Sequence, residues 1–247
     1  MKRIGLDIGS RTVKMVLLED NKIIETRKEI NSFDPLKIAE NIMADYKGLP
    51  LVVTGYGRNL FNQHYQCKKI SEIKAFADGA YFLNPNIRTI LDIGGQDTKV
   101  ITLNENGKMT KFEMNDKCSA GTGRFLEIMS MALGYTLEEF SKLKIDNITP
   151  LIINSMCTVF AESEVISTLA KGAKREAVAS GLMRSVVKRS ISMMKKVGIK
   201  NEIMFAGGVA FNEQLVRFLN DELKTKVFIA DDPQIVGALG AALNADE

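Results

Sequence analysis

Two aspartates stand where phosphate chemistry could occur, each at the end of an apolar run and directly before a glycine turn. Asp7-Ile-Gly-Ser-Arg-Thr-Val-Lys14 and Asp92-Ile-Gly-Gly-Gln-Asp-Thr-Lys99 carry Asp, Ile, Gly and Lys in register. Glycine lets backbone N–H groups approach phosphate oxygens, and a carboxylate can hold Mg²⁺ through water because Mg²⁺ dehydrates reluctantly. A single turn of this kind is common in ordinary hairpins, but two copies in register favour a nucleoside triphosphate site.

Other side chains in these turns supply candidate catalytic and binding groups. Ser10 and Thr12 add hydroxyl donors, Lys14 adds positive charge, and Gln96 or Asp97 could orient an attacking water. We therefore predict catalytic roles for Asp7, Asp92, Gln96 and Asp97. The predicted cofactor-binding residues are Gly9, Ser10, Arg11, Thr12, Val13, Lys14, Gly94, Gly95, Gly121, Thr122, Gly207, Gly208, Val209, Asn212 and Gln234.

A third glycine turn, Gly207-Gly-Val-Ala-Phe-Asn212, lies between a predicted strand and a predicted helix and strengthens the case for nucleotide binding. No Gly-Lys-Ser/Thr follows any of these glycines, so the pattern is not a Walker A loop, and it is not a Rossmann fingerprint either.

The elements that must position these turns also repeat. Each copy predicts three antiparallel strands, over 4–8, 13–18 and 22–27 and again over 87–93, 99–103 and 108–114. Further strands are expected over 51–54, 203–205 and 227–230, and helices over 36–46, 73–82, 122–133, 158–170, 174–197, 213–223 and 234–244. This order predicts an α/β fold of two similar lobes with a cleft between their turns, divided into 1–84 and 85–247. The C-terminal helix is a candidate to pack back on the first lobe.

Two of the three cysteines precede predicted helix N-termini, Cys118 in Asn115-Asp-Lys-Cys-Ser-Ala and Cys157 in Asn154-Ser-Met-Cys-Thr. A helix N-terminus favours a thiolate and equally an anionic iron–sulfur cluster, with Ser119, Thr122 or Thr158 available as caps. Taken alone, both cysteines are also compatible with small buried side chains. The spacing excludes a zinc finger, and Cys67 is expected to be a structural or surface thiol.

The composition is that of an ordinary globular protein, with 45% hydrophobic residues, 26% charged residues and a net charge of +3. Scattered basic residues disfavour nucleic-acid binding, and the N-terminal run resembles neither a signal peptide nor a membrane span. An odd number of separated cysteines is typical of a reducing cytoplasm.

Several motifs together resemble a known family. They are Gly55-Tyr-Gly-Arg58, Asp92–Asp97, the Cys118 segment, Cys157-Thr-Val-Phe-Ala-Glu-Ser-Glu-Val165 and Gly207-Gly-Val-Ala210. These resemble the activator component of 2-hydroxyacyl-CoA dehydratases, within the BadF/BadG/BcrA/BcrD ATPases of the acetate and sugar kinase, Hsp70 and actin superfamily. The similarity runs over nearly the whole chain.

The resemblance implies ribonuclease H-like (actin-like ATPase) lobes, each with a mixed sheet flanked by helices, and hydrolysis of Mg²⁺-bound ATP to ADP. It also implies that Cys118 and Cys157 ligate one [4Fe–4S] cluster per homodimer, since a cubane takes four thiolates and one chain offers two in such settings. The implied activity is transfer of one electron to an iron–sulfur partner, with ferredoxin or flavodoxin as the upstream donor.

Some alternatives stay open from the sequence. The electron acceptor could be a 2-hydroxyacyl-CoA dehydratase, a double-cubane protein or a benzoyl-CoA reductase. A small-molecule kinase would leave Cys118 and Cys157 unexplained. A non-catalytic nucleotide-dependent module would leave Gln96 and Asp97 unexplained. Arg11 and Phe211 depart from the residues usual in the family, and Glu72 reads either as a cleft residue or as an exposed carboxylate at a helix N-terminus.

Overall fold

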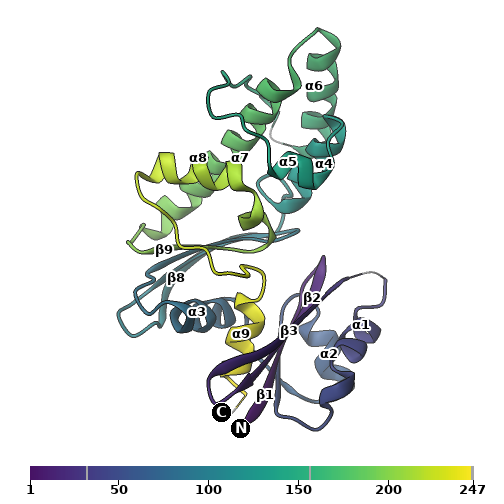
Figure 1. Cartoon of the computed structure of the whole chain (residues 1–247), viewed down its shortest axis with the longest axis vertical. Helices are drawn as coiled ribbons and strands as arrows, with labels where there is room; N and C mark the ends of the chain where they lie inside the picture. Colours follow the sequence, from purple (N-terminus) through teal and green to yellow (C-terminus); the bar gives the residue numbers. More distant parts are fainter. Residues whose placement is uncertain (32, 156, 246–247) are drawn as a thin grey trace.

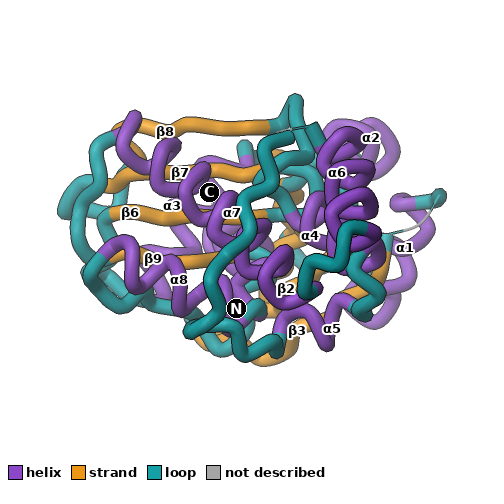
Figure 2. The backbone as a smooth tube through the Cα atoms, turned by 90° about the horizontal axis from the view of Figure 1, so that it is seen from above, coloured by secondary structure: helices purple, strands orange, loops and turns teal. Residues whose placement is uncertain are grey.

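Two mixed sheets, each built around one copy of the repeat, form the framework of the computed structural model, which describes residues 1–31, 33–155 and 157–245 (Figure 1). The first sheet contains β1 (Lys2–Ile8), β2 (Thr12–Glu19), β3 (Lys22–Ile30), β4 (Leu51–Thr54) and β5 (Lys68–Lys69), in the order β3-β2-β1-β4-β5. The second contains β6 (Thr89–Ile93), β7 (Thr98–Leu103), β8 (Met109–Asn115) and β9 (Ile203–Ala206), in the order β8-β7-β6-β9. Figure 2 shows these last four strands side by side.

The two sheets repeat the same pairing. Asp7 of β1 lies opposite Lys14 of the antiparallel β2, and Asp92 of β6 lies opposite Lys99 of the antiparallel β7. On the other side, β1 runs parallel to β4 and β6 runs parallel to β9. The predicted duplicated α/β fold of mixed sheets flanked by helices is therefore confirmed.

The helices of the N-terminal part of the chain pack on both sheets, because the first two α-helices contact the first sheet and the third contacts the second sheet. They are α1 (Pro35–Ile42), the 3-10 helix η1 (Ala44–Tyr46), α2 (Arg58–Tyr65) and α3 (Glu72–Leu83). Asp34 caps α1 by accepting from the backbone N–H of Lys37, and Pro35 stands in the first turn.

The C-terminal helix α9 (Val236–Leu243) packs against both α3 and the first sheet. The approach to β1 is so close that a Cβ on Gly5 would lie 1.9 Å from the carbonyl oxygen of Ala238. In Figure 1, α9 stands between α3 and the strands of the first sheet. The chain thus returns to its starting lobe, while the division into 1–84 and 85–247 stays a prediction.

The remaining helices build the larger core on one side of the second sheet. They are α4 (Gly123–Ala132), α5 (Leu137–Ser141), α6 (Thr158–Ala170), α7 (Arg175–Val197) and α8 (Glu213–Leu223), with the 3-10 helix η2 (Gly208–Phe211) before α8. Phe125, Met183 and Phe218 pack with Leu91 and Phe205 of the sheet in one buried cluster. Burial of this apolar surface is what holds the sheet and helices together.

One predicted strand is wrong. The segment 227–230 makes only an isolated bridge between Phe228 and Met204, with the Phe205 N–H donating to the Phe228 carbonyl. Ladder pairing stops there because the chain turns away toward Pro233, whose carbonyl accepts a hydrogen bond from the Gly207 N–H.

Two short helices, α2 and α5, were not predicted. Each buries only one side chain, Phe61 in α2 and Phe140 in α5, so neither shows the repeated apolar spacing that predicts a helix.

No helix within the described ranges is both long enough and apolar enough to cross a membrane.

Candidate nucleotide site and paired cysteines

A cavity of about 590 Å³ opens between the two copies of the glycine turn. Its size falls within the range of small-molecule sites. Its lining includes predicted residues of all three turns together with Gln234: Asp7, Gly9, Ser10, Arg11, Thr12, Lys14, Asp92, Gly94, Gly95, Gln96, Asp97, Gly207, Gly208, Val209, Asn212 and Gln234.

The two aspartates carry matching lysine partners. Lys14 Nζ lies 3.1 Å from Asp7 Oδ2, and Lys99 Nζ lies 3.1 Å from Asp92 Oδ2. The antiparallel register explains both contacts, because it places each lysine directly opposite its aspartate. The second pair is the more deeply buried, with both side chains 3% exposed.

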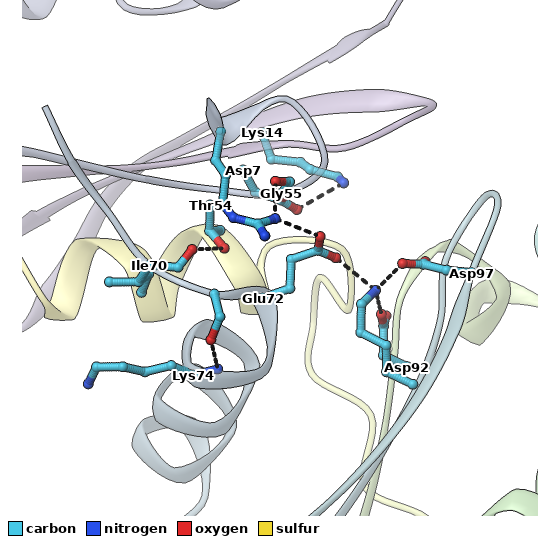
Figure 3. A network of polar contacts seen from close by, with 12 residues as sticks. Asp7, Lys14, Thr54, Gly55, Ile70, Glu72, Lys74, Asp92 and Asp97 are labelled. Atoms are coloured by element: carbon cyan, nitrogen blue, oxygen red, sulfur yellow. Dashed lines mark hydrogen bonds and ion pairs between the residues drawn. The ribbon is translucent and has the colours of Figure 1, made fainter. Parts of the chain in front are cut away.

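Lys99 binds two further carboxylates. Its ammonium lies 2.7 Å from Asp97 Oδ2 and 2.9 Å from Glu72 Oε2. Glu72 also pairs with Arg58 at 3.5 Å, and Arg58 donates to the Gly55 carbonyl at 2.8 Å. In Figure 3, Glu72 lies between Asp7 on one side and Asp92 and Asp97 on the other, so this network connects the first sheet to the second.

Burial raises the pKa of Asp92 to about 6, since the attraction of Lys99 is offset by repulsion from Asp97 and Glu72. Burial alone would lower the pKa of Lys99, but attraction to Asp92, Asp97 and Glu72 outweighs it and holds that pKa well above its ordinary value. One permanent positive charge is thus shared among three carboxylates, and this arrangement favours a further cation.

Asp92 is suited to help hold Mg²⁺. Its Oδ1 atom is buried and has no hydrogen-bond partner, whereas Oδ2 receives the Lys99 ammonium. Mg²⁺ usually keeps several waters and binds one or two carboxylates together with substrate phosphates. A free carboxylate oxygen beside the phosphate turns fits that mode.

Each aspartate has a glycine of positive φ whose backbone lies close to its carboxylate. Gly55 (φ +91°) follows β4, and a Cβ there would lie 2.4 Å from Asp7 Oδ1. Gly207 (φ +86°) follows β9, and a Cβ there would lie 2.5 Å from Asp92 Oδ1 and 2.4 Å from the Ile93 carbonyl oxygen. Only glycine satisfies both the conformation and the space, so Gly55 is the counterpart of Gly207.

The third turn forms the far end of the cavity. A Cβ on Gly208 would lie 3.1 Å from Gln234 Nε2, so these two predicted residues face each other. Phe211 lines the same cavity, is 49% exposed, and has the Lys28 ammonium 5.7 Å from its ring centre. An exposed aromatic face can stack on a nucleotide base.

Three predicted binding residues lie outside the cavity lining. Val13 is fully buried because β2 alternates its side chains and Val13 faces the core. Thr122 is also buried, and its hydroxyl donates to the Ser119 carbonyl, while the Gly121 carbonyl accepts from Thr98. Gly121 and Thr122 therefore shape the loop before α4, and Gly123 and Arg124 reach the cavity in their place.

The sequence did not single out Lys99, Arg58 or Glu127 as site residues. Lys99 carried a usable signal, because it is the repeat counterpart of Lys14. Glu72 is only 18% exposed and lines the cavity, so the interpretation of it as an exposed carboxylate is wrong.

The segments that carry Cys118 and Cys157 are in contact through the residues that follow each cysteine. The hydroxyls of Ser119 and Thr158 lie 2.9 Å apart and join the two cysteine segments. Cys118 is partly buried and Cys157 is exposed, and in the described part of the chain no group of three or more Cys, His, Asp or Glu forms a metal site. Two thiols in adjoining segments fit half of a four-thiolate set.

Cys157 stands at the start of α6. The helix begins at Thr158 as predicted, but the N-cap is Cys157 and not Thr158, and the Cys157 side chain makes no cap hydrogen bond. The partial positive charge of a helix N-terminus therefore lies beside the Cys157 side chain.

The second glycine turn is hydrogen-bonded to the helix that follows Cys118. The backbone N–H of Gly123 donates to the Gly94 carbonyl at 2.9 Å, and that of Arg124 donates to the Gly95 carbonyl at 2.8 Å. These bonds join the phosphate side of the cavity to α4.

Curated relatives match this chain over nearly its full length. The 2-hydroxyisocaproyl-CoA dehydratase activator of Clostridioides difficile is 42% identical over 99% of this chain and 95% of its own. The activator of lactoyl-CoA dehydratase of Anaerotignum propionicum is 43% identical over 100% of this chain and 98% of its own.

Solved structures agree in fold. The activator of 2-hydroxyisocaproyl-CoA dehydratase from Clostridium difficile, with bound ADPNP, superposes with a TM-score of 0.90 at 40% identity, covering 99% of this chain and 94% of its own. Component A of (R)-2-hydroxyglutaryl-CoA dehydratase from Acidaminococcus fermentans gives 0.91 at 36% identity, covering 100% of both chains. The ethanolamine utilization protein EutJ from Carboxydothermus hydrogenoformans, at 15% identity and a TM-score of 0.66 over 98% of this chain and 90% of its own, shares the fold alone.

A sequence profile of one family matches residues 4–245. With the duplicated sheets, the paired aspartates and these relatives, the match shows that the chain belongs to the BadF/BadG/BcrA/BcrD ATPase family.

Proposed function

We propose that this chain is an ATP-driven electron donor that activates an iron–sulfur enzyme. It would hydrolyse ATP and pass one electron from a [4Fe–4S] cluster shared by two copies of the chain. The observation that carries the proposal is the pair of hydrogen bonds from Gly123 and Arg124 to Gly94 and Gly95, because they join the phosphate turn to the helix after Cys118.

Residues of both repeats would bind Mg²⁺ and the phosphates of the nucleotide. Asp7 and Asp92 would hold Mg²⁺ through water, and backbone N–H groups around Gly9 and Gly94 would bind phosphate oxygens. Gln96 or Asp97 would orient the attacking water, with Asp97 held in place by Lys99 at 2.7 Å. Gly207, Gly208 and Gln234 would receive the adenosine.

Each chain would supply half of the cluster site. Cys118 and Cys157 offer two thiolates, and two-fold symmetry would bring the same pair from a second copy. Exposed apolar side chains lie on α6 just after Cys157, with Val159 and Phe160 each 67% exposed and Ile166 55% exposed. Such a patch is suited to contact with a second copy. When bound, the cluster supplies one-electron transfer at low potential.

Coupling would run through α4 and α6. A change at the Gly94–Gly95 turn on hydrolysis would move the start of α4, and the Ser119–Thr158 contact would pass that motion to the start of α6. Solvent exposure and hydrogen bonding around a cluster both set its potential. Reduced thiols of this kind persist in an oxygen-free cytoplasm, where a ferredoxin or flavodoxin would be the electron source.

The proposed acceptor is a 2-hydroxyacyl-CoA dehydratase, as the names of the relatives with 42% and 43% identity suggest. The alternative is an aryl-CoA reductase, which similarity to one of the benzoyl-CoA reductase subunits of Thauera aromatica supports at 30% identity.

The test is acceptor activation under anaerobic conditions. Cluster-loaded, dithionite-reduced protein mixed with an iron–sulfur 2-hydroxyacyl-CoA dehydratase should start dehydration only with Mg²⁺ and ATP, and not with ADP. Conversion of ATP to ADP with transfer of the phosphoryl group to a small molecule in place of release of inorganic phosphate, and with the acceptor enzyme left inactive, would favour a kinase and contradict the proposal.

A further inference from the structure

An arginine of the first glycine turn reaches across the cavity to the helix that follows Cys118. Arg11 Nη2 lies 2.5 Å from Glu127 Oε1, although the two residues belong to different repeats. Arg11 is 48% exposed and Glu127 24% exposed, and both line the cavity. We call this contact the Arg11–Glu127 pair.

The pair spans the gap between the two phosphate turns. A Cβ on Gly95 would lie 2.3 Å from Arg11 Cγ and 3.1 Å from Arg11 Cβ, so the arginine stem lies directly over the second turn. The guanidinium thus stands where both turns face the cavity, which is where a nucleotide's terminal phosphate would lie if the proposed ATPase function holds.

Glu127 can release Arg11 without becoming an unpaired carboxylate. Its other oxygen, Oε2, lies 2.9 Å from Arg124 Nη1 on the preceding turn of α4. A carboxylate that keeps one cation loses less on giving up the second than an isolated ion pair would. Arg11 has no comparable second carboxylate partner among the contacts of the described residues.

Resting on the proposed ATPase function, we propose that Arg11 is a triphosphate-sensing residue that exchanges Glu127 for the terminal phosphate of the bound nucleotide. A guanidinium matches phosphate and carboxylate oxygens with the same planar fork, so the exchange conserves its hydrogen bonds. A diphosphate leaves the Arg11–Glu127 pair in place, because its phosphates end before the guanidinium.

The exchange would reach the cysteine segment through α4. Glu127 lies one helical turn after Gly123 and Arg124, whose N–H groups are bonded to the second phosphate turn. Loss of the cross-cavity pair frees α4 from the first repeat while those two backbone bonds hold it to the second. Binding of the third phosphate thereby changes the contacts of α4: the Arg11–Glu127 pair is broken, and the bonds to the second phosphate turn remain.

The test compares affinities for ADPNP and ADP in iron-free protein, by titration with fluorescent analogues of both. Arg11→Ala should lower the ratio of ADPNP to ADP affinity about tenfold, the value of one charge-assisted hydrogen bond, and Arg11→Lys should lower it less. Glu127→Gln should raise the ratio several-fold by freeing Arg11, and in the Arg11→Ala background it should change nothing. The Arg217–Asp146 pair, 3.1 Å apart and outside the cavity, provides matched controls in Arg217→Ala and Asp146→Asn.

The outcomes separate this inference from the proposed function. If wild-type protein binds neither nucleotide, the proposed ATPase function and this inference both fail. If it binds both but Arg11→Ala weakens them by the same factor, Arg11 does not sense the third phosphate and only this inference fails. The same holds if Glu127→Gln raises the ratio equally with and without Arg11, since a general charge effect would then explain it. Hydrogen exchange of 123–132 should differ between the ADPNP and ADP complexes in wild type and not in Arg11→Ala, whose folding the same experiment monitors.

Discussion

Lys99 Nζ lies 3.1 Å from Asp92 Oδ2 in a pair that repeats, at the same distance, the contact of Lys14 with Asp7. The repeats differ in what surrounds the lysine. Lys14 is 13% exposed beside its aspartate, whereas Lys99 is 3% exposed and also binds Asp97 and Glu72. The second repeat therefore concentrates charge, and its lysine should matter more to the folded state than the lysine of the first.

Replacing Lys99 should destabilise the fold far more than replacing Lys14. Lys99→Met would leave three carboxylates near one another without their shared cation, and breaking a buried pair costs about 3–5 kcal/mol. Lys14→Met disturbs one pair nearer to solvent and should cost less. Urea unfolding of both variants, without nucleotide, measures the difference in free energy of unfolding. Equal losses would show that the carboxylates around Lys99 are not electrostatically dependent on it.

Asp92 should make the stability of the protein fall as pH rises. Its pKa is about 6 when folded against 3.8 ordinarily, so between these values the unfolded chain loses the proton while the folded protein keeps it. The free energy of unfolding then decreases with pH and the loss is complete above pH 6, at up to about 3 kcal/mol. The Asp92→Asn variant has no carboxyl group to titrate there. Its free energy of unfolding minus that of wild type should therefore rise from pH 4 to pH 6 and then level off. A relative stability that stays flat over that range would contradict a raised pKa.

Gly207→Ala should abolish nucleotide binding through a steric effect. The new Cβ would lie 2.4 Å from the Ile93 carbonyl oxygen and 2.5 Å from Asp92 Oδ1, and it would displace the carboxylate proposed to help hold Mg²⁺. Gly172→Ala is the matched control, because Gly172 has a similar φ of +89° with nothing within 4 Å of a Cβ. Calorimetric titration with Mg²⁺ and ADPNP should find binding kept in the control and lost in Gly207→Ala. Equal binding in the two variants would show that the clash does not matter.

Much of the fold could be predicted because short local motifs are enough to recognise the repeat. Asp, Gly and Lys recur in register, and the strands they predict form two sheets with the same pairing. The bounds of α6 and α8 agree with the prediction, since Gly172 of positive φ follows the end of α6 and Asn212 caps α8 by accepting from the Leu215 N–H. The strand predicted over 227–230 failed because its pairing depends on where β9 ends, which local apolar character does not encode.

The site was less predictable where partners come from distant elements. The glycine turns are recognisable from local sequence, but the contacts of Glu72 with Lys99 and of Arg11 with Glu127 depend on how the two repeats face each other. Val13 and Thr122 lie next to true lining residues and point away from the cavity, which only strand alternation and the loop before α4 determine. For Val13 and Thr122, a position next to a lining residue in the sequence did not predict contact with the cavity.

The central claim is that Cys118 and Cys157 of two chains together hold one cluster. Iron and subunit mass, measured on protein reconstituted anaerobically, test it most directly. We expect about four iron atoms per two chains in wild type. Cys118→Ala and Cys157→Ala should each lose most of the iron while keeping ADPNP binding. Cys67→Ala is the matched control and should keep the full complement. Cys67 packs against the core of the first sheet, where burial raises the pKa of its thiol, whereas Cys118 packs against the other, larger core. Full iron in either of the first two variants, or four irons on a single chain, would contradict the account.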